Sequence, residues 1–412
     1  MYRLVLLSLV LVGALALPTM APYTAVYVAL SAAVLCFVSF ARSLPQVLAH
    51  PSYLAVAAAC LALALTIPFT WRSADDLMIV IWMLPILIAV GIVPPLMKEP
   101  RFGAPAVIAA FCLVGAIGAV AIGAYDALAF GTSRAGGDNN PIHFAGLATI
   151  LGFSALVGIF QHDSRWRFIF LLGPLFGATA VLLSGSRGPI LSVLVLFVLT
   201  MPLLAYWFRH AWLFWAVPLV AASAIVAAIM ILAPGQNHYV LDAIDSAQAA
   251  TRYLVENNFA TMSQGPANID GSTWQRLIYL RGALNAFGDS PIVGHGAGQL
   301  ISAAAAHFPP GYEHLGAHLH ADIANFAVVA GIVGLVAYGL MLSAPFLAAL
   351  YAQDPARKRA VLLLAIVLGA GYFTLGLTNG VFGILAQTLL YGILLASAVN
   401  LSLYARRDQD ID

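Results

Sequence analysis

The sequence predicts an all-α polytopic membrane protein with about twelve transmembrane helices and one large loop that contains short helices. Three observations support this fold class. Of the 412 residues, 62% are hydrophobic and only 8% are charged, whereas soluble domains carry roughly 25% charged residues. Twelve stretches are apolar over about 20 residues, the length at which a helix crosses a bilayer. One long segment, residues 234–319, contains no such stretch.

The predicted transmembrane helices follow one another closely. They are expected near residues 4–20, 22–42, 50–69, 76–96, 104–130, 142–160, 167–184, 187–206, 210–233, 320–350, 358–377 and 380–404. Arg3 before the first apolar run is typical of a signal peptide, but the second span follows almost at once, so we expect an uncleaved first helix. Cys36, Cys60 and Cys112 lie in apolar runs without metal-type spacing and are expected to serve in packing.

The basic residues predict which ends of the helices face the cytoplasm. With the N-terminus inside, the cytoplasmic connections hold 12 of the 18 lysines and arginines: Arg3, Arg42, Lys98, Arg101, Arg165, Arg167, Arg209, Arg357, Lys358, Arg359, Arg406 and Arg407. We therefore expect nine helices within residues 1–233, a large periplasmic loop over 234–319, and three helices with a short cytoplasmic tail over 320–412. The net charge of +1 gives no indication of a nucleic-acid partner.

The large loop carries the signals of a helix. Ser272-x-x-Gln275 matches a capping box, and Gly288 indicates where the helix stops. Between them apolar residues recur at helical spacing, namely Trp274, Leu277, Leu280, Leu284 and Phe287. The sequence therefore predicts a helix on or near the membrane surface that carries Arg276 and Arg281. Because five residues turn about 140° around a helix, these arginines are not expected to point at one small ligand together.

Arginines on the outer side oppose the positive-inside rule, and anion binding is the most direct reason for them. Arg187 lies in the turn Ser-Gly-Ser-Arg-Gly-Pro at 184–189, where Ser186 is the expected cap of the next helix. A helix N-terminus beside a guanidinium suits a phosphate. Arg134 similarly precedes Asn140-Pro141, the expected start of another helix. The alternative is that these arginines only extend to lipid head groups.

Two histidines, His318 and His320, lie where the loop returns to the membrane. Imidazole accepts and returns a proton near neutral pH, so either histidine is a candidate base. If a helix has already begun there, the two side chains are about 160° apart and only one faces a common pocket. A metal site of His314, His318 and Asp322 is the weaker interpretation, because Gly316 disfavours a helix. We expect neither a metal nor a cofactor.

Several motifs occur together in this chain. They are "SRAGGDNNPIHFAG" at 133–146, Ser-Arg-Gly at 186–188, an arginine-led helix that ends in "SPIVGHGAG" at 290–298, and "HLHADIANFAVVAGIVGLV" at 318–336. In this combination the chain resembles the O-antigen ligase family of polytopic bacterial membrane proteins, which shares a domain with surface-polysaccharide polymerases. The number of spans and the place of the large loop also resemble that family, so the resemblance covers most of the chain.

The resemblance implies a metal-independent, inverting glycosyltransferase of the GT-C class. Such enzymes transfer a polysaccharide from undecaprenyl pyrophosphate to a sugar hydroxyl of lipid A–core at the outer face of the inner membrane, in lipopolysaccharide biosynthesis. The implied partners are this donor, this acceptor and membrane lipids. At the matching positions, Arg187 and Arg276 are implied to hold the pyrophosphate, and His320 to deprotonate the acceptor. Arg134 and Arg281 are further candidates for the pyrophosphate, and His318 for the base.

Two departures from the family pattern bear on the site. The asparagine expected after the histidine is Ala321 here, and an aromatic often found four residues after the loop arginine is Leu280. They leave open whether His318 or His320 is the base. The first alternative function is a surface-glycan polymerase or a protein O-oligosaccharyltransferase with the same donor, although polymerases often carry a second large loop. The second is a lipid-linked sugar transporter, for which Asp126 is the lone charged candidate within a span.

Overall fold

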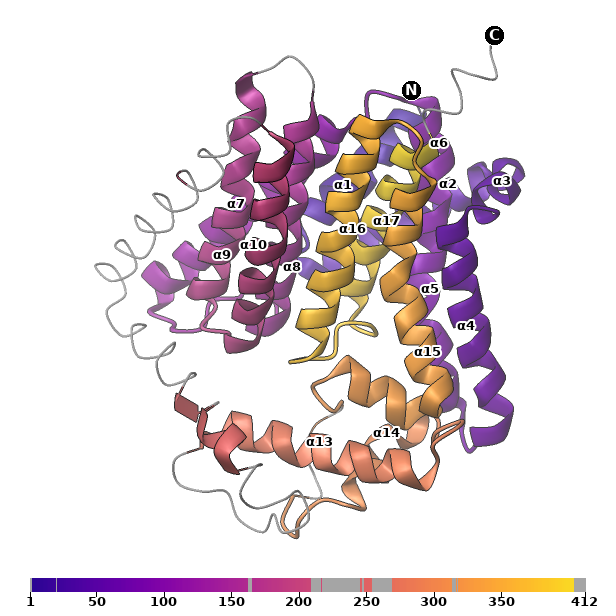
Figure 1. Cartoon of the computed structure of the whole chain (residues 1–412), viewed down its shortest axis with the longest axis vertical. Coiled ribbons are helices and arrows are strands. Elements are labelled where there is room, and N and C mark those ends of the chain that lie inside the picture. Colours follow the sequence, from indigo (N-terminus) through magenta and orange to yellow (C-terminus); the bar gives the residue numbers. More distant parts are fainter. Residues whose placement is uncertain are drawn as a thin grey trace.

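The computed structural model describes residues 2–19, 21–161, 165–208, 216, 245–246, 248–253, 269–312, 316 and 318–403. Every regular element in these ranges is a helix, and ten helices there are long and apolar enough to cross a membrane. Figure 1 shows the long helices side by side, with a layer of helices from the orange part of the chain across one end. The predicted all-α, multi-pass membrane fold is confirmed.

The helices have the following bounds. The N-terminal half contains α1 (Tyr2–Leu15), α2 (Pro22–Ser39), α3 (Leu44–Leu48), α4 (Pro51–Thr70), α5 (Met78–Ala89), α6 (Val93–Lys98), α7 (Pro105–Phe130), α8 (Pro141–Ser154), α9 (Leu172–Leu183) and α10 (Arg187–Trp207). The C-terminal half contains α13 (Gly271–Asp289), α14 (Leu300–Ala305), α15 (Asp322–Tyr351), α16 (Pro355–Gly376) and α17 (Leu385–Leu403). Short 3-10 helices are η1 (Ala41–Ser43), η2 (Ala74–Leu77), η3 (Val90–Ile92), η4 (Ala155–Phe160), η5 (Arg165–Leu171) and η8 (Ala297–Gln299).

Most predicted spans correspond to a helix or to a run of helices. The predicted first span is α1, which is shorter than the ten membrane-length helices. The span predicted at 76–96 is a continuous run from η2 to α6, and the span at 142–160 is α8 followed by η4. The span predicted at 210–233 lies outside the described residues apart from Ala216. The total of twelve therefore stays a prediction.

Burial separates central helices from peripheral ones. In α17, 94% of an 18-residue apolar stretch is buried inside the protein, and in the run of α8 and η4 the share is 89%, but in α4 it is only 39%. On α4 the side chains of Leu61, Leu65 and Phe69 are exposed at intervals of four residues and so lie on one face. An apolar stripe of this length suits contact with lipid tails.

Helix α13 lies across the end of the bundle, as Figure 1 shows, and confirms the predicted loop helix. The predicted apolar face was partly wrong. Trp274 and Leu277 are buried, but Leu280 and Leu284 are exposed, and Tyr279 is buried instead. The reason is tertiary contact, because α13 packs on α14 and α15 through small residues. A Cβ atom at Gly282, for example, would collide with the ring of Phe308.

A glycine-rich segment, residues 291–298, follows α13 and is hydrogen-bonded to α15, so that it links the end layer formed by α13 and α14 to the bundle. The helix α15 is kinked at Ala330 and Gly331, where φ and ψ leave the helical region. The freed backbone groups are satisfied by the segment: Ile332 N–H donates to the Pro291 carbonyl at 2.8 Å, and Gly296 N–H donates to the Val329 carbonyl at 2.9 Å. The segment thus holds the end layer firmly to a long helix of the bundle.

Candidate functional site

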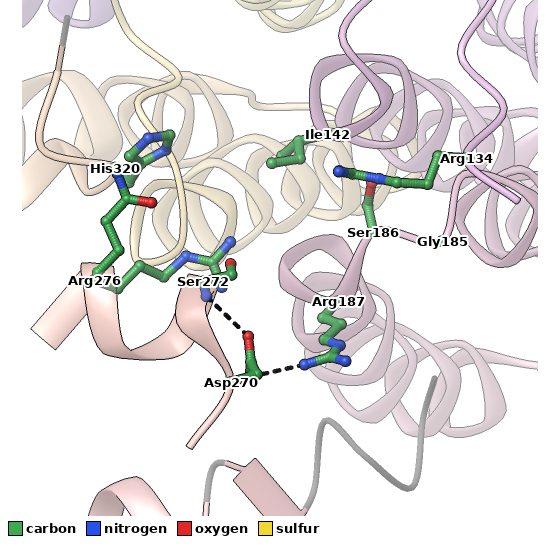
Figure 2. A pocket seen from close by; sticks show the side chains of 10 residues that line it. Arg134, Ile142, Gly185, Ser186, Arg187, Asp270, Ser272, Arg276 and His320 are labelled. Atoms are coloured by element: carbon green, nitrogen blue, oxygen red, sulfur yellow. Dashed lines mark hydrogen bonds and ion pairs between the residues drawn. The ribbon is translucent and has the colours of Figure 1, made fainter. Parts of the chain in front are cut away.

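A cavity of about 440 Å³ lies where α13 faces the ends of α8 and α10. Its volume is within the range of sites for small molecules. The lining residues, most of which Figure 2 labels, come from four separate parts of the chain: Arg134, Ile142, Gly185, Ser186, Arg187, Asp270, Ser272, Gln275, Arg276 and His320. Four of the six residues predicted from the sequence therefore share one cavity, while Arg281 and His318 are not among its lining residues.

The loop before α8 places Arg134 at the cavity. Asp126, near the end of α7, accepts hydrogen bonds from the N–H groups of Gly136 at 3.0 Å and Gly137 at 2.7 Å. The N–H of Ala135 donates to the carbonyl of Leu183 at 3.1 Å. The buried carboxylate of Asp126 therefore anchors the loop that carries Arg134. This structural task accounts for the charged residue that the transporter hypothesis would use.

The turn between α9 and α10 places Arg187 at the cavity. Gly185 has a φ of +58°, a conformation that glycine adopts without steric cost, and a Cβ there would lie 2.8 Å from the Ser133 carbonyl. Ser186 occupies the N-cap position of α10, as predicted, but its side chain makes no capping hydrogen bond. Its hydroxyl donates instead to the Ser184 carbonyl at 3.4 Å. The predicted position is confirmed and the predicted capping bond is wrong.

Asp270 caps α13 and pairs with Arg187. One carboxylate oxygen accepts from the N–H groups of Ser272 and Thr273 at 3.0 and 3.1 Å, and the other lies 2.9 Å from the Arg187 guanidinium. The cap of α13 is therefore Asp270 and not Ser272, so the predicted capping box is wrong by two residues. A carboxylate at this position both accepts the cap hydrogen bonds and interacts favourably with the helix dipole. Burial acts to raise the pKa of Asp270, but hydrogen bonds from Ser246 and Thr273 and the Arg187 charge outweigh it and lower the pKa to about 2.

The cavity carries a net positive charge. Three arginines and one aspartate line it, and Figure 2 shows Arg134 and Arg187 on the side opposite Arg276 and His320. Burial lowers the pKa of Arg276, and the neighbouring charges of Arg187 and Arg134 lower it further while Asp270 opposes them. An arginine stays charged in proteins. Three guanidinium groups that interact electrostatically across one cavity are suited to bind a multiply charged anion such as a pyrophosphate.

His320 lies beside the arginines in an unusual backbone conformation. Its φ is +52°, and it is the one non-glycine residue with positive φ in the described ranges. Such conformations persist where the surroundings enforce them, often at functional sites. The imidazole Nδ1 lies 3.2 Å from the amide oxygen of Asn379, and the ring lies 4.3 Å from that of His318. Burial, followed by the influence of His318, lowers the pKa of His320 to about 4, so the ring is neutral at pH 7.

The first turn of α15 holds the histidine segment against the loop after α16. The carboxylate of Asp322 is buried and accepts from the N–H of Val381 at 2.8 Å and of Phe382 at 3.3 Å. The amide oxygen of Asn325 accepts from the N–H of Leu319 at 3.0 Å. Asp322 therefore already serves the backbone, which disagrees with a role as metal ligand. His314, the first residue of that hypothesis, lies outside the described residues.

Sequence reasoning missed four residues of this site. Asp270 had a local signal, an acidic residue just before the predicted helix, and His143 lay inside a motif that was noted for other residues. His143 is close enough to His318 and His320 to interact with both electrostatically. Tyr279, three residues after Arg276, places an aromatic ring 5.5 Å from the His320 ring, one position before the Leu280 departure. Asn379 had no signal, because it lies 59 residues away from His320.

The matched family covers the centre of the site. Residues 172–339 match the family model described as O-antigen ligase. This segment includes Arg187, Arg276 and His320, whereas Arg134 lies before it. A comparison with curated proteins found no match. The chain therefore carries, over residues 172–339, the domain of the O-antigen ligase family that its sequence motifs predicted.

Proposed function

We propose that this protein is an O-antigen ligase that transfers a polysaccharide from undecaprenyl pyrophosphate to a sugar hydroxyl of lipid A–core. The observation that carries the proposal is the shared cavity of Arg134, Arg187, Arg276 and His320. This transfer requires positively charged groups that stabilise the leaving pyrophosphate and a base that accepts the proton of the acceptor hydroxyl, and both kinds of group line this cavity. The O-antigen ligase domain at residues 172–339 supports the same reaction class.

In the proposed reaction, the oxygen of the acceptor hydroxyl attacks the anomeric carbon of the donor sugar. The bond from that carbon to the pyrophosphate oxygen breaks, and undecaprenyl pyrophosphate leaves with the bonding electrons. Attack opposite the leaving group inverts the configuration at the anomeric carbon. His320 takes the proton of the hydroxyl, and the arginines balance the charge that develops on the leaving group. Because the leaving group is already anionic, the reaction needs neither a general acid nor a metal ion.

The donor is proposed to prepare the base. Burial, the neighbouring His318 and the positive charge of Arg276 all lower the pKa of His320, whereas the hydrogen bond to Asn379 raises it. A bound pyrophosphate opposes the Arg276 charge and so raises the basicity of His320. We therefore expect the donor to bind before the acceptor. The prenyl tail of the donor would lie between helices in the bilayer, with its head group in the cavity.

We also infer that the cavity faces the periplasm, with both termini in the cytoplasm and a GT-C type of architecture. Figure 1 shows the N-terminus and α6, the helix that ends at Lys98, at the end of the bundle opposite α13. The positive-inside rule assigns this end to the cytoplasm. The inner membrane of a bacterium is the expected location, because the proposed donor and acceptor meet at its outer face.

The proposal is tested by a transfer assay with purified protein, a lipid-linked glycan and lipid A–core, read on a gel. We expect wild type to extend lipid A–core and His320→Ala to lose at least about 100-fold in rate. His307→Ala is the matched control, because His307 lies on the same end layer, outside the cavity, and bonds to Asp289 at 2.7 Å. Elongation of the prenyl-linked glycan in place of lipid A–core would assign the polymerase function, and an untouched lipid A–core would refute the ligase.

A further inference from the structure

The loop after α16 presents one buried amide to the histidine of the cavity. Asn379 is 3% exposed, and its amide oxygen lies 3.2 Å from Nδ1 of His320. We propose that Asn379 is a positioning residue that holds His320 as the tautomer protonated on Nδ1, so that Nε2 is the nitrogen that receives the proton of the acceptor hydroxyl. This inference rests on the proposed function and adds to it the residue that decides which nitrogen reacts.

The chemistry of the contact determines the tautomer. An amide oxygen only accepts hydrogen bonds, so the nitrogen that faces it must carry the proton. A neutral imidazole carries one N–H, and therefore the lone pair of His320 is on Nε2. Among the described residues, Nδ1 is the ring nitrogen of His320 that has a hydrogen-bond partner. Nε2 thus keeps its lone pair for a ligand in the cavity.

The neighbouring histidine is engaged differently. Nδ1 of His318 lies 3.4 Å from the backbone N of His320, and the His318 ring also has a hydrogen bond to its own backbone. His318 is not among the residues that line the cavity. The His318 ring thus faces the local backbone, whereas Nε2 of His320 is left for the cavity. This difference favours His320 as the base, a choice that the sequence left open.

The amide nitrogen of Asn379 indicates that this residue is present for the hydrogen bond of its oxygen. Nδ2 of Asn379 is buried and has no hydrogen-bond partner in the part of the chain that the structure describes. An unpaired buried N–H destabilises the folded protein, and an apolar side chain of similar size would avoid this cost. An amide whose role was only to fill space would gain nothing from this arrangement. Its oxygen, in contrast, has a specific partner in His320.

Both sides of the contact are tied to the same helix end. Asp322 binds the N–H groups of Val381 and Phe382, just after Asn379, and Asn325 binds the N–H of Leu319, just before His320. These two side chains sit in the first turn of α15. The strained φ of His320 is maintained by this double attachment. The distance between Asn379 and His320 is therefore set by rigid structure on both sides.

The test measures the His320–Asn379 contact without depending on transfer activity. Diethyl pyrocarbonate modifies unprotonated imidazole, so the rate of modification of His320, read by peptide mass spectrometry against pH, gives the midpoint of its titration. The titratable groups that face His320 are His318, His143, Tyr279 and Arg276, and all of them stay unchanged in the variants. Asn379→Asp keeps an oxygen for Nδ1 but adds a negative charge, which stabilises the protonated ring. We expect its midpoint to move up by about one pH unit or more.

Activity supplies the second measurement. Asn379→Ala is expected to lower kcat about 10-fold or more with little change in KM for the donor, because the donor contacts remain. Asn379→Asp is expected to keep most of the activity and to shift the acidic limb of the kcat profile to higher pH. The matched control is Asn400→Ala, which removes another buried amide with an unpaired oxygen near the opposite end of the bundle. Gel filtration and thermal unfolding identify variants that do not fold.

The outcomes separate the two proposals. A midpoint in Asn379→Asp equal to that of wild type overturns the positioning role, whatever the transfer assay shows. Equal losses of kcat in Asn379→Ala and Asn400→Ala also overturn it, because both then reflect only packing. If wild type fails to extend lipid A–core but the midpoint moves, the proposed function fails while the contact between Asn379 and His320 stands.

Discussion

One histidine at each end of the bundle is held in the structure, His50 buried and His320 half-buried, and the two differ in how their ring nitrogens are used. His50 is 2% exposed; its Nδ1 accepts from the Ser52 N–H at 3.2 Å, and its Nε2 bonds to the Ser402 hydroxyl at 3.0 Å. In His320, Nδ1 forms a hydrogen bond with the amide oxygen of Asn379, and the residue lines a cavity that three arginines also line. A histidine with both nitrogens engaged caps a helix and joins α4 to α17. One with an open nitrogen beside a cavity is able to move a proton.

The backbone around the two histidines differs as well. His50 has an ordinary extended conformation and serves as the N-cap of α4, so its geometry costs nothing. His320 has a φ of +52° and depends on Asp322 and Asn325 to keep it. A strained residue that is held by neighbouring side chains, one of which is itself bound to the distant loop at Val381, indicates selection for position rather than for stability. The comparison predicts that mutations at the His50 end reduce stability and mutations at the His320 end reduce activity.

The largest expected effect is the contrast between the two histidines themselves. His320→Ala should lower the transfer rate at least about 100-fold with a modest change in thermal unfolding, because a general base contributes about that factor or more. His50→Ala should lower the unfolding midpoint, since it removes two buried hydrogen bonds, and keep kcat per folded molecule. Initial transfer rates and thermal unfolding in detergent measure both. A His50→Ala protein that folds normally but has lost transfer would break the comparison.

The second effect concerns the arginines of the cavity. Arg276→Gln should raise KM for the donor by about 10- to 100-fold, because it removes charged hydrogen bonds to a phosphate. Arg276→Lys should recover only part of this loss, since a lysine does not reproduce the planar donor geometry. The matched control is Arg281→Gln on the same helix, because Arg281 does not line the cavity. Equal rises of KM in Arg276→Gln and Arg281→Gln would refute the assignment of the donor site.

The third effect is the pH dependence of stability that Asp270 imposes. Its pKa is lowered to about 2, so the ionised carboxylate stabilises the fold above its ordinary pKa and loses this effect as the pH falls toward 2. Asp270→Asn keeps an oxygen to cap α13 but not the charge opposite Arg187. The variant should be less stable than wild type by about 1 kcal/mol at pH 6, after allowance for solvent screening. Chemical unfolding in detergent should show this difference vanish near pH 2, and a constant difference would contradict it.

The smallest effect separates His318 from His320. His318 lowers the pKa of His320 by its proximity, so its removal should let that pKa rise. His318→Gln is expected to lower the transfer rate less than about 10-fold and to shift the acidic limb of the pH profile upward. The pH dependence of kcat measures both changes. A loss as large as that of His320→Ala would instead identify His318 as the base.

The sequence predicted the elements of the fold better than their contacts. Spans were found because a run of about 20 apolar residues indicates a membrane helix without reference to any neighbour. The helix at 271–289 was also found, but its buried face was partly wrong at Leu280 and Leu284. Which face a helix buries depends on the surface it meets, and here small residues such as Gly282 let α14 and Phe308 approach closely. Asp270 as the cap, in place of Ser272, had a local signal that was missed, whereas its pairing with Arg187 from another helix had none.

The sequence by itself predicted a multi-pass membrane protein with the domain of the O-antigen ligase family that the family model matches at residues 172–339, because apolar length and short motifs are local properties. It also singled out Arg134, Arg187, Arg276 and His320 one by one. Only the tertiary structure decided that these four share a cavity while Arg281 does not line it. The proposed distinction between His318 and His320 also rests on tertiary structure, since it depends on Asn379, a residue 59 positions away that no local pattern connects to a histidine. Hydrophobicity acts on a segment alone, whereas the protonation of one nitrogen depends on the atom folded against it.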